Sequence, residues 1–513
     1  MAQVKANWRW NDKTVKPTLG DLVAGVSVAL ILIPQSLAYA EIAGVPSFHG
    51  LYAAALAPIA ASFFASSPYL QTGPVAMTSL LTFGALSGLA TSGSSSFALL
   101  AALLALLVGF WRMLIGFSRG GVVAYLMSRA VLTGFTAGAA LVIISTQLPT
   151  ALGYEPGGSH LFSAAMATVV HPDHWDWKAV GITAMTVFIT NGGKKIHPAF
   201  PGVLVAVAAG LVFSRFANYQ GAVVGAIPTG LPPMELALPW DQIFHLIIPA
   251  FVIALVGFAE PAAIARTYAV QDRSKWDPNK EFVSQGMANI ASGLFAGFPV
   301  GGSFSRTSVN RISGGKTRWS GAITGFTVLA FLPFASVLST LPRAVLAAIV
   351  ISAVTKLIDF KSLSKMFAHS RPQGLIGIGT FFATIGLAPR VDIAVLLGVG
   401  AAVVVHLWRE LHIHIETKIQ DTTLTIKPMG VLFFASAPTV EETLIEILAS
   451  SPDVTTVVID LARLGRIDFT AAMVLDQILN DAEKTGLTVS VEGVPPQARR
   501  ILSRIMPSRV SAN

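Results

Sequence analysis

The sequence Pro299-Val300-Gly301-Gly302-Ser303-Phe304-Ser305-Arg306 interrupts an otherwise apolar part of the chain. The segment that it opens, Pro299–Ile312, is too short and too broken for an ordinary membrane span, because a helix needs about 20 apolar residues to cross a bilayer. A second segment of the same kind, Gln71–Leu89, opens with Gln71-Thr72-Gly73-Pro74. We expect both segments to contain short helices that begin within a membrane.

The composition of the 513-residue chain favours the bilayer as the solvent for most of it. Hydrophobic residues make up 53% of the chain, charged residues 12%, and the mean hydropathy is +0.65. Soluble domains carry about 25% charged residues. The net charge of +8 is distributed as membrane topology requires, so we expect no nucleic-acid partner. The absence of cysteine excludes disulfides and thiol catalysis.

Twelve further segments are apolar enough to be spans, which with the two broken segments predicts fourteen transmembrane segments. They are Leu19–Glu41, His49–Ala65, Phe97–Gly116, Val122–Leu152, Ala179–Thr190, Pro201–Phe213, Ile243–Tyr268, Phe282–Phe298, Ser320–Ser336, Ala344–Leu357, Gly374–Leu387 and Asp392–Trp408. Lys5, Arg9, Lys13 and Lys16 precede the first of them, which we interpret as a span and not as a cleaved signal.

The basic residues test this topology. With the N-terminus inside, the loops predicted outside hold only Lys178, Arg215, Arg343 and Arg390. The inside loops hold Arg112, Arg119, Lys194, Lys195, Arg266, Arg273, Lys275, Lys280, Arg311, Lys316, Arg318, Lys356, Lys361, Lys365, Arg371 and, after the last span, Arg409. Arg129 also falls inside if the fourth span begins after it. This positive-inside pattern predicts a protein of the cell inner (plasma) membrane with both termini cytoplasmic.

The character of the chain changes at about His412, which predicts a membrane domain over residues 1–411 and a compact α/β domain over residues 412–513. We expect its strands at Thr423–Lys427, Val431–Ala435, Val454–Asp460 and Thr488–Glu492. We expect its helices at Val440–Ala449, Thr470–Glu483 and Gln497–Ile505.

The two breaks belong to a repeat. Polar Gln35 follows Pro34 in the first span, and the break at Gly73-Pro74 comes two segments later. Glu260 precedes Pro261 in the seventh long span, and the break at Gly302 again comes two segments later. Seven spans in each half give the halves opposite orientations, which is the inverted-repeat design of secondary transporters.

The breaks predict an anion site. Irregular backbone survives in a membrane only where it lines a protein cavity, and a half-helix directs free N–H groups and about half a positive charge at that cavity. Gly73, Gly301 and Gly302 permit close backbone approach, and Ser303 and Ser305 add hydroxyl donors. Glycine and proline kinks in ordinary packed helices are the alternative, but two breaks at matching places favour the site.

Two ionisable residues lie at the expected depth of this site. An arginine there costs roughly 2.5–3.5 kcal/mol on insertion scales, so Arg306 either completes the anion site or pairs with Glu260. Glu260 either carries a proton with the anion or is the permanently ionised partner of Arg306. Gln35 and Tyr39 lie one helical turn apart on one face, where Gln35 donates to the substrate and Tyr39 walls the pocket or serves only packing.

These residues resemble the sulfate permease family, which includes bicarbonate, dicarboxylate and sulfate carriers and the motor protein prestin. The similarity lies in residues 33–40 with Ala43-Gly44-Val45-Pro46, in Gly73-Pro74-Val75-Ala76 and in residues 302–307. The tail resembles a STAS domain through residues 430–435 and Asp468-Phe469-Thr470.

The resemblance implies a polytopic α-helical membrane protein with fourteen segments in a 7+7 inverted repeat, core and gate subdomains, elevator-type movement and a homodimer. It implies an anion between the third and tenth helices, lined by Gln35, Tyr39, Val75, Ser305 and Arg306, with Glu260 as the coupling acid. Many relatives have threonine where this chain has Gly301, which bears on substrate choice. Thr470 stands where related STAS domains often carry a phosphorylatable serine. Because it begins a predicted helix, we expect it to be an N-cap, and Asp468 to be a turn or cap residue.

The sequence therefore predicts a proton-coupled symporter of a small inorganic anion, most simply sulfate. A bicarbonate or dicarboxylate carrier and an anion exchanger are alternatives within the class. A chloride channel or voltage-driven motor, and a membrane-tethered scaffold whose STAS domain is the active part, are alternatives outside it. We expect no enzyme, no cofactor and no metal site, because no metal-ligand spacing, nucleophile motif or phosphate loop appears.

Overall fold

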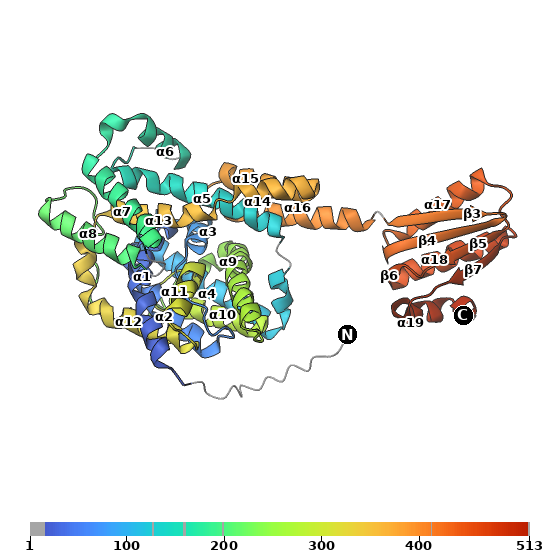
Figure 1. Ribbon diagram of the computed structural model, residues 1–513, viewed down its shortest axis with the longest axis horizontal. Helices are drawn as coiled ribbons and strands as arrows, with labels where there is room; N and C mark the ends of the chain where they lie inside the picture. The colour runs from blue at the N-terminus through green and yellow to red at the C-terminus, as the bar shows by residue number, and fades with distance from the viewer. Residues whose placement is uncertain (1–15, 126–127, 157–160, 197–199, 412, 511–513) are drawn as a thin grey trace. The chain divides into compact units, whose positions relative to one another are not determined.

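The computed structural model describes residues 16–125, 128–156, 161–196, 200–411 and 413–510 (Figure 1). The chain forms two compact units, Met1–Val399 and Gly400–Asn513, which are considered separately below. Lys5, Arg9 and Lys13, used above for the topology, lie outside the described residues, and so does His412, where we predicted the second domain to begin. The boundary between residues 411 and 412 stays a prediction.

The first unit is helical and contains two very short strands (Figure 1). Its helices are α1 (Leu19–Ala43), α2 (Phe48–Phe64), α3 (Ala76–Leu86), α4 (Ser95–Phe117), α5 (Arg129–Leu152), α6 (Leu161–Val170), α7 (Trp177–Ile196), α8 (Gly202–Phe216), α9 (Ile243–Gln271), α10 (Pro278–Leu294), α11 (Phe304–Ile312), α12 (Trp319–Phe331), α13 (Arg343–Val354), α14 (Phe360–His369), α15 (Arg371–Gly386) and α16 (Val391–Leu411), the last of which continues into the second unit. The strands are β1 (Thr72–Gly73) and β2 (Gly301–Gly302).

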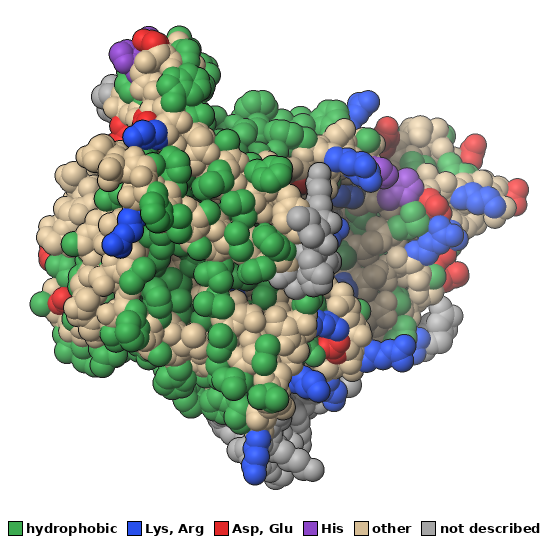
Figure 2. Space-filling view, turned by 60° about the vertical axis from the view of Figure 1, so that its left-hand side comes forward, with side chains coloured by type: hydrophobic (Ala, Val, Ile, Leu, Met, Phe, Trp, Pro, Cys, Tyr) green, Lys and Arg blue, Asp and Glu red, His purple; other side chains and the backbone are tan. Residues whose placement is uncertain are grey.

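Each predicted span overlaps one of these helices, and the short helices α6 and α14 were not expected. Six helical segments of the described residues are long and apolar enough to cross a bilayer. On the face shown in Figure 2, hydrophobic side chains cover much of the surface of the helical unit. Large hydrophobic residues that are exposed in this unit include Phe188, Phe216 and Phe244. Such a surface suits lipid and not water. How many segments span the membrane stays a prediction.

Two details of the topology prediction are wrong. The stretch Val122–Leu152 is not one span, because a 3₁₀ helix at Gly120–Tyr125 precedes α5, which begins at Arg129. Arg112 is not a loop residue, because it lies within α4 with its side chain fully buried. Its guanidinium finds acceptors inside the protein, which the positive-inside count cannot detect.

The helices pack in two groups. The first helix group combines α1–α4 with α9–α12, through contacts such as α2 with α10 and α1 with α12. The second helix group combines α5, α7 and α8 with α13–α15. Each group thus takes consecutive helices from both halves of the chain, as two interlocked repeats of opposite orientation do.

The C-terminal unit is an α/β domain whose strands order as β3-β4-β5-β7, with β6 also pairing with β4. The pair β3–β4 is antiparallel, and the other pairs are parallel. The strands are β3 (His414–Gln420), β4 (Thr423–Leu432), β5 (Thr456–Asp460), β6 (Leu464–Ile467) and β7 (Thr488–Glu492). The helices are α17 (Ala437–Ser450), α18 (Phe469–Lys484), α19 (Pro496–Ile505) and α20 (Pro507–Val510). Alternate residues of β4 and β5 face a core shared with α17, α18 and α19.

Two predictions for this unit are wrong. The segments Thr423–Lys427 and Val431–Ala435 are not separate strands, because β4 runs through Pro428 without a break. A proline lacks an N–H, but Pro428 lies where the pairing with β5 has ended at Ile426 and the pairing with β6 has not begun. The strands β3 and β6 were not expected.

Thr470 is not an N-cap. The N-cap of α18 is Asp468, whose carboxylate accepts hydrogen bonds from Ala471 N at 2.7 Å and from Phe434 N at 3.1 Å. The expectation that Asp468 is a cap residue is confirmed, and the carboxylate also fixes the loop that follows β4.

Candidate anion-binding site

The two broken segments lie directly beside each other. Strands β1 and β2 pair antiparallel, with Thr72 opposite Gly302 and Gly73 opposite Gly301. The helix α3 begins three residues after β1 and α11 two residues after β2, so both helices start at this crossing. We call this pair of strands, with the two helix starts, the crossing.

The starts of both helices leave backbone donors available. Their N-cap residues, Val75 and Ser303, are extended, and neither side chain caps its helix. The first N–H groups of a helix have no partner within it and carry its positive partial charge. One of these donors is used in this structure, because Phe304 N donates to Glu260 Oε1 at 3.2 Å.

Buried polar side chains hold the irregular backbone of the crossing. Asn289 of α10 accepts from Val300 N at 3.0 Å and donates to Val300 O at 3.1 Å. Gln285, one turn earlier, donates to Thr72 Oγ1 at 2.7 Å, and Thr78 of α3 donates to Pro299 O at 2.9 Å. These bonds keep the crossing rigid, since unpaired backbone groups are costly in an apolar medium.

The sequence contained a signal for these residues. Gln285, Asn289 and Ser292 lie at four- and three-residue spacing on α10, and therefore on one face of it. A polar stripe on a helix of an apolar domain predicts a buried polar partner, which here is the backbone before β2, since Ser292 donates to Phe298 O.

Arg306 is fully buried in the first turn of α11. Its Nη1 donates to Pro74 O at 2.9 Å, while Nε and Nη2 have no hydrogen-bond partner among the described residues. A Cβ at Gly73 would lie 3.5 Å from Nη2, so the guanidinium touches β1. None of the ion pairs among the described residues joins Arg306 to Glu260, so the alternative in which they pair is not realised here.

The glycines of the crossing are needed for close packing. A Cβ at Gly302 would lie 2.7 Å from Leu70 Cδ1, and one at Gly301 would lie 3.3 Å from Val75 Cγ2. The first distance is too short for any real side chain, so Gly302 has no room for a Cβ unless Leu70 moves.

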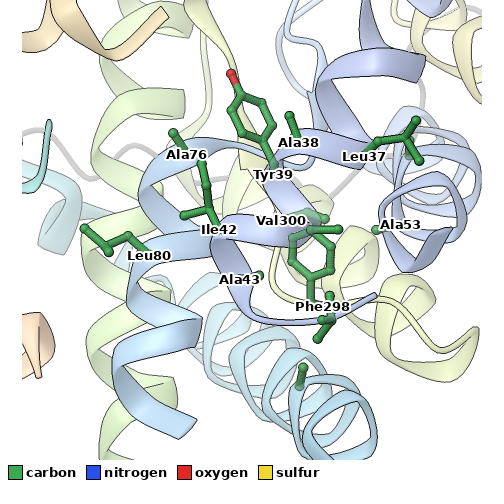
Figure 3. Close-up of a cluster of buried hydrophobic side chains, with 14 of the residues drawn as sticks. Leu37, Ala38, Tyr39, Ile42, Ala43, Ala53, Ala76, Leu80, Phe298 and Val300 are labelled. Carbon is green, nitrogen blue, oxygen red and sulfur yellow. The ribbon is translucent and has the colours of Figure 1, made fainter. Parts of the chain in front are cut away.

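Gln35 and Tyr39 are buried on α1. Figure 3 shows that Tyr39 lies beside residues of α1 and α3, among them Ile42 and Ala76, with Val300 of the segment before β2 close by. Gln35 Oε1 has no hydrogen-bond partner among the described residues. Both residues therefore lie next to the crossing, and the side-chain oxygen of Gln35 is free to accept a hydrogen bond there.

A cavity of about 640 Å³ reaches this region. Gln35, Phe304 and Ser305 line it, and the Ser305 hydroxyl lies 3.2 Å from that of Ser303. Lys356 and Ser313, which the topology predicts on the inner side, also line the cavity. Seven of the predicted site residues are not among its lining residues, namely Tyr39, Gly73, Val75, Glu260, Gly302, Ser303 and Arg306.

Two broken helices that start side by side in a helical membrane domain are the arrangement found in transporters built from inverted repeats. Family comparison identifies the protein further. The model of the sulfate permease family matches residues 19–380, and that of the STAS domain matches residues 414–508. The chain belongs to the sulfate permease family, which confirms the resemblance found in the sequence.

Several relatives are named for sulfate. The chain is 37% identical to "Probable sulfate transporter Rv1739c" of Mycobacterium tuberculosis, over 77% of this chain and 71% of that protein. It is 33% identical to "Sulfate transporter 4.1, chloroplastic" of Arabidopsis thaliana, over 79% and 61%. It is 28% identical to the "Sodium-independent sulfate anion transporter" of Bos taurus, over 94% and 85%.

Solved structures confirm the fold. Murine Slc26a9, an anion transporter solved in an inward-facing state, superposes with a TM-score of 0.87 at 19% identity, over 96% of this chain and 88% of that one. The transmembrane domain of the cyanobacterial bicarbonate transporter BicA gives a TM-score of 0.63 at 26% identity, over 75% and 97%. The chain is thus a multi-pass membrane protein of an anion-transporter family with a C-terminal STAS domain.

Proposed function

We propose that this chain is a secondary transporter that carries sulfate across the membrane together with a proton. The carrying observation is the Arg306 guanidinium, which is buried at the start of α11 with Nε and Nη2 unpartnered. A buried guanidinium whose donors lack partners is costly, and a bound anion that accepts from them lowers that cost. The relatives named for sulfate support this anion among the candidates.

The anion binds between the starts of α3 and α11. The free N–H groups of both first turns and the hydroxyls of Ser303 and Ser305 donate to its oxygens, and Arg306 supplies a charged donor. Gln35 donates from α1, while Tyr39 and Val75 wall the pocket. Gly73 and Gly302 let the backbone approach the anion.

Glu260 carries the proton. Its Oε1 accepts from Phe304 N, so this carboxylate occupies a first-turn donor of α11 that an anion also needs. Protonation weakens that hydrogen bond and removes the negative charge next to the site. Binding of the proton therefore strengthens binding of the anion, and by reciprocity the anion strengthens binding of the proton, which favours their transport together.

Transport proceeds by elevator-type alternating access. The first helix group carries the crossing and the second helix group forms the gate, so the site moves with a rigid body. The cavity that reaches Ser305 from the predicted inner side supports an inward-open resting arrangement. We further propose a homodimer in the plasma membrane with both termini cytoplasmic and with domains at residues 1–411 and 412–513.

Uptake into proteoliposomes tests the function. Labelled sulfate, bicarbonate and fumarate are offered separately, each with and without an inward proton gradient. We expect saturable sulfate uptake that the gradient accelerates. Uptake that does not saturate would indicate a channel, and sulfate uptake indifferent to the gradient would exclude symport. Deletion of residues 413–513 should leave transport measurable, and its complete loss would favour the scaffold alternative.

Bicarbonate is the second candidate substrate. The similarity to the transmembrane domain of a bicarbonate transporter, at 26% identity and over 75% of this chain, favours it. Bicarbonate uptake that exceeds sulfate uptake in the same vesicles would establish this alternative.

A further inference from the structure

Arg112 is a second fully buried arginine at the crossing, and the proposed function gives it no role. It projects from α4, near the end of that helix, toward α9 and the segment that precedes β2. Its Nη1 donates to Val300 O at 2.9 Å, its Nε to Ala254 O at 3.2 Å and its Nη2 to Ile253 O at 3.4 Å. All three acceptors are backbone carbonyls.

The charge of Arg112 is therefore uncompensated. None of the ion pairs among the described residues includes it, so its positive charge is balanced only by the dipoles of three carbonyl groups. Burial of such a charge costs several kcal/mol when no partner is near, by the general estimate for ions in protein interiors. A buried cation that the fold itself does not neutralise contributes to the electrostatic potential of nearby sites.

The Arg112 guanidinium and the first turn of α3 both pack against Gly257 of α9. A Cβ at Gly257 would lie 2.7 Å from Arg112 Nη2 and 2.9 Å from Thr78 Cγ2. Only a glycine at this position lets the guanidinium and the first turn of α3 come so close to α9. A Cβ at Gly301 would in turn lie 3.4 Å from Gly257 O. Arg112, Gly257 and β2 are thus in successive contact.

The two buried arginines have matching positions on the crossing. The register that places Gly73 opposite Gly301 makes Pro74 and Val300 the next pair of residues across the two strands. Arg306 donates to Pro74 O and Arg112 donates to Val300 O. Each guanidinium thus binds the carbonyl oxygen next to one of the two strands, Arg306 beside β1 and Arg112 beside β2. The negative ends of these two carbonyl groups are therefore paired with cations close to the proposed anion site.

We propose that Arg112 positions the crossing and, by its uncompensated charge, makes the anion site prefer divalent over monovalent anions. This inference rests on the proposed anion site. Arg112 does not touch the anion and acts through the backbone at Val300 and through its field.

Charge balance supports the preference. Among the described residues, the charged side chains that meet at the crossing are those of Arg112 and Arg306, which are buried, and that of Glu260, which is half-buried. With Glu260 protonated, the two arginines balance a doubly charged anion. With Glu260 ionised, they balance a singly charged one. A divalent anion thus fits the proton-loaded site, which links valence to coupling.

Anion valence gives a test that separates charge from shape. The interaction of an anion with a fixed charge scales with the charge of the anion, so the logarithm of the loss in affinity should be about twice as large for a divalent as for a monovalent anion. We expect Arg112→Gln to weaken nitrate binding roughly tenfold and selenate binding roughly hundredfold, because the factor for the divalent anion is the square of that for the monovalent one. Calorimetric titration of the purified full-length protein measures both dissociation constants.

Two control variants define the alternatives. Asn289→Ala removes the other side-chain donor to Val300 O without a change in charge, so it should weaken both anions by the same factor. Arg129→Gln removes an exposed arginine and should change neither affinity. Equal factors for selenate and nitrate in Arg112→Gln would overturn the proposed role of the charge.

Arg112→Lys keeps the inference testable if Arg112→Gln does not fold. A buried lysine loses its proton within an accessible pH range, whereas arginine does not. The ratio of selenate to nitrate affinity should therefore fall with rising pH more steeply in Arg112→Lys than in the unaltered chain. Identical pH profiles would reject the inference. If the unaltered chain binds neither anion, the proposed site itself falls, which is a distinct result.

Discussion

Arg306 has more hydrogen-bond donors than the surrounding protein has acceptors for, because Pro74 O takes one and Nε and Nη2 remain without a partner among the described residues. The sequence left open whether this arginine completes an anion site or pairs with Glu260. In this structure the two are not paired, and Glu260 instead accepts from Phe304 N. Substitution of Arg306 and of Glu260 distinguishes a role in binding or coupling from a structural role.

Arg306→Ala should weaken sulfate binding by about ten- to hundredfold, since a hydrogen bond to a charged group contributes about 1.5–3 kcal/mol. Calorimetric titration with sulfate measures the loss. Arg311→Ala is the matched control, because Arg311 lies on the same helix but pairs with Asp272 at 2.6 Å near the surface. Near-normal sulfate binding by Arg306→Ala would show that Arg306 is structural.

Glu260→Gln should abolish acceleration of uptake by a proton gradient and leave sulfate binding within a few-fold of normal. The glutamine cannot exchange a proton, but its amide oxygen can still accept the bond from Phe304 N that Glu260 accepts now. Uptake is measured with and without a gradient, and binding by titration. If the gradient still drives uptake, another group carries the proton.

At the scale of the element, each short strand and the helix that follows it form one unit of the site. The sequence indicated both breaks through their glycines and prolines, but it did not indicate that β1 and β2 pair with each other. It also assigned the cap of α18 to Thr470, where Asp468 has the cap role. A cap depends on which backbone N–H groups a side chain reaches, so a shift of two residues changes the assignment.

Asp468→Ala should loosen the first turn of α18, because loss of a capping side chain typically costs about 1 kcal/mol. We expect amide hydrogen exchange in that turn to accelerate about fivefold, which corresponds to that free energy under exchange by local opening. Thr470→Ala is the matched control and should change exchange little. Equal effects of both substitutions would contradict the assignment of the cap.

On the scale of the whole molecule, an ion pair joins the two helix groups. Arg343 Nε at the start of α13 lies 3.0 Å from Glu41 Oε1 near the end of α1, and Ser47 Oγ donates to the same oxygen at 2.9 Å. The Glu41 side chain is 8% exposed and the Arg343 side chain 36%, so the carboxylate is shielded from solvent while the guanidinium is partly exposed. It borders a cleft of about 430 Å³ on the predicted outer side, while the cavity at Ser305 extends to residues of the predicted inner side.

Glu41→Gln should therefore favour arrangements in which the outer side is open. The chain has no cysteine, so a single Ile227→Cys, which is buried in the outer cleft, reports the opening. We expect a membrane-impermeant maleimide to label this cysteine several-fold faster in the Glu41→Gln background. Asp272→Asn breaks an ion pair within the first helix group and should not change the rate. An unchanged rate in Glu41→Gln would show that the ion pair does not hold the outer side closed.

The sequence alone determined the class of the protein. Apolar segments, the distribution of basic residues and two matched breaks depend on local composition and spacing, which lipid solvation constrains strongly. The sequence also identified Gln35, Glu260 and Arg306 as candidate site residues, because a polar or charged residue within an apolar span is rare and usually functional.

Only the tertiary structure decided how those residues are paired. Arg112 was counted as a loop cation, and the support from Gln285 and Asn289 was missed, because their partners lie on other elements. Arg112 and Asn289 donate to Val300 O in the segment before β2, and Gln285 donates to the hydroxyl of Thr72 in β1. The pairing of Thr72 with Gly302 likewise joins two halves of the molecule. A hydrogen bond is specified by distance and direction between atoms, and periodicity within one helix carries no information about either.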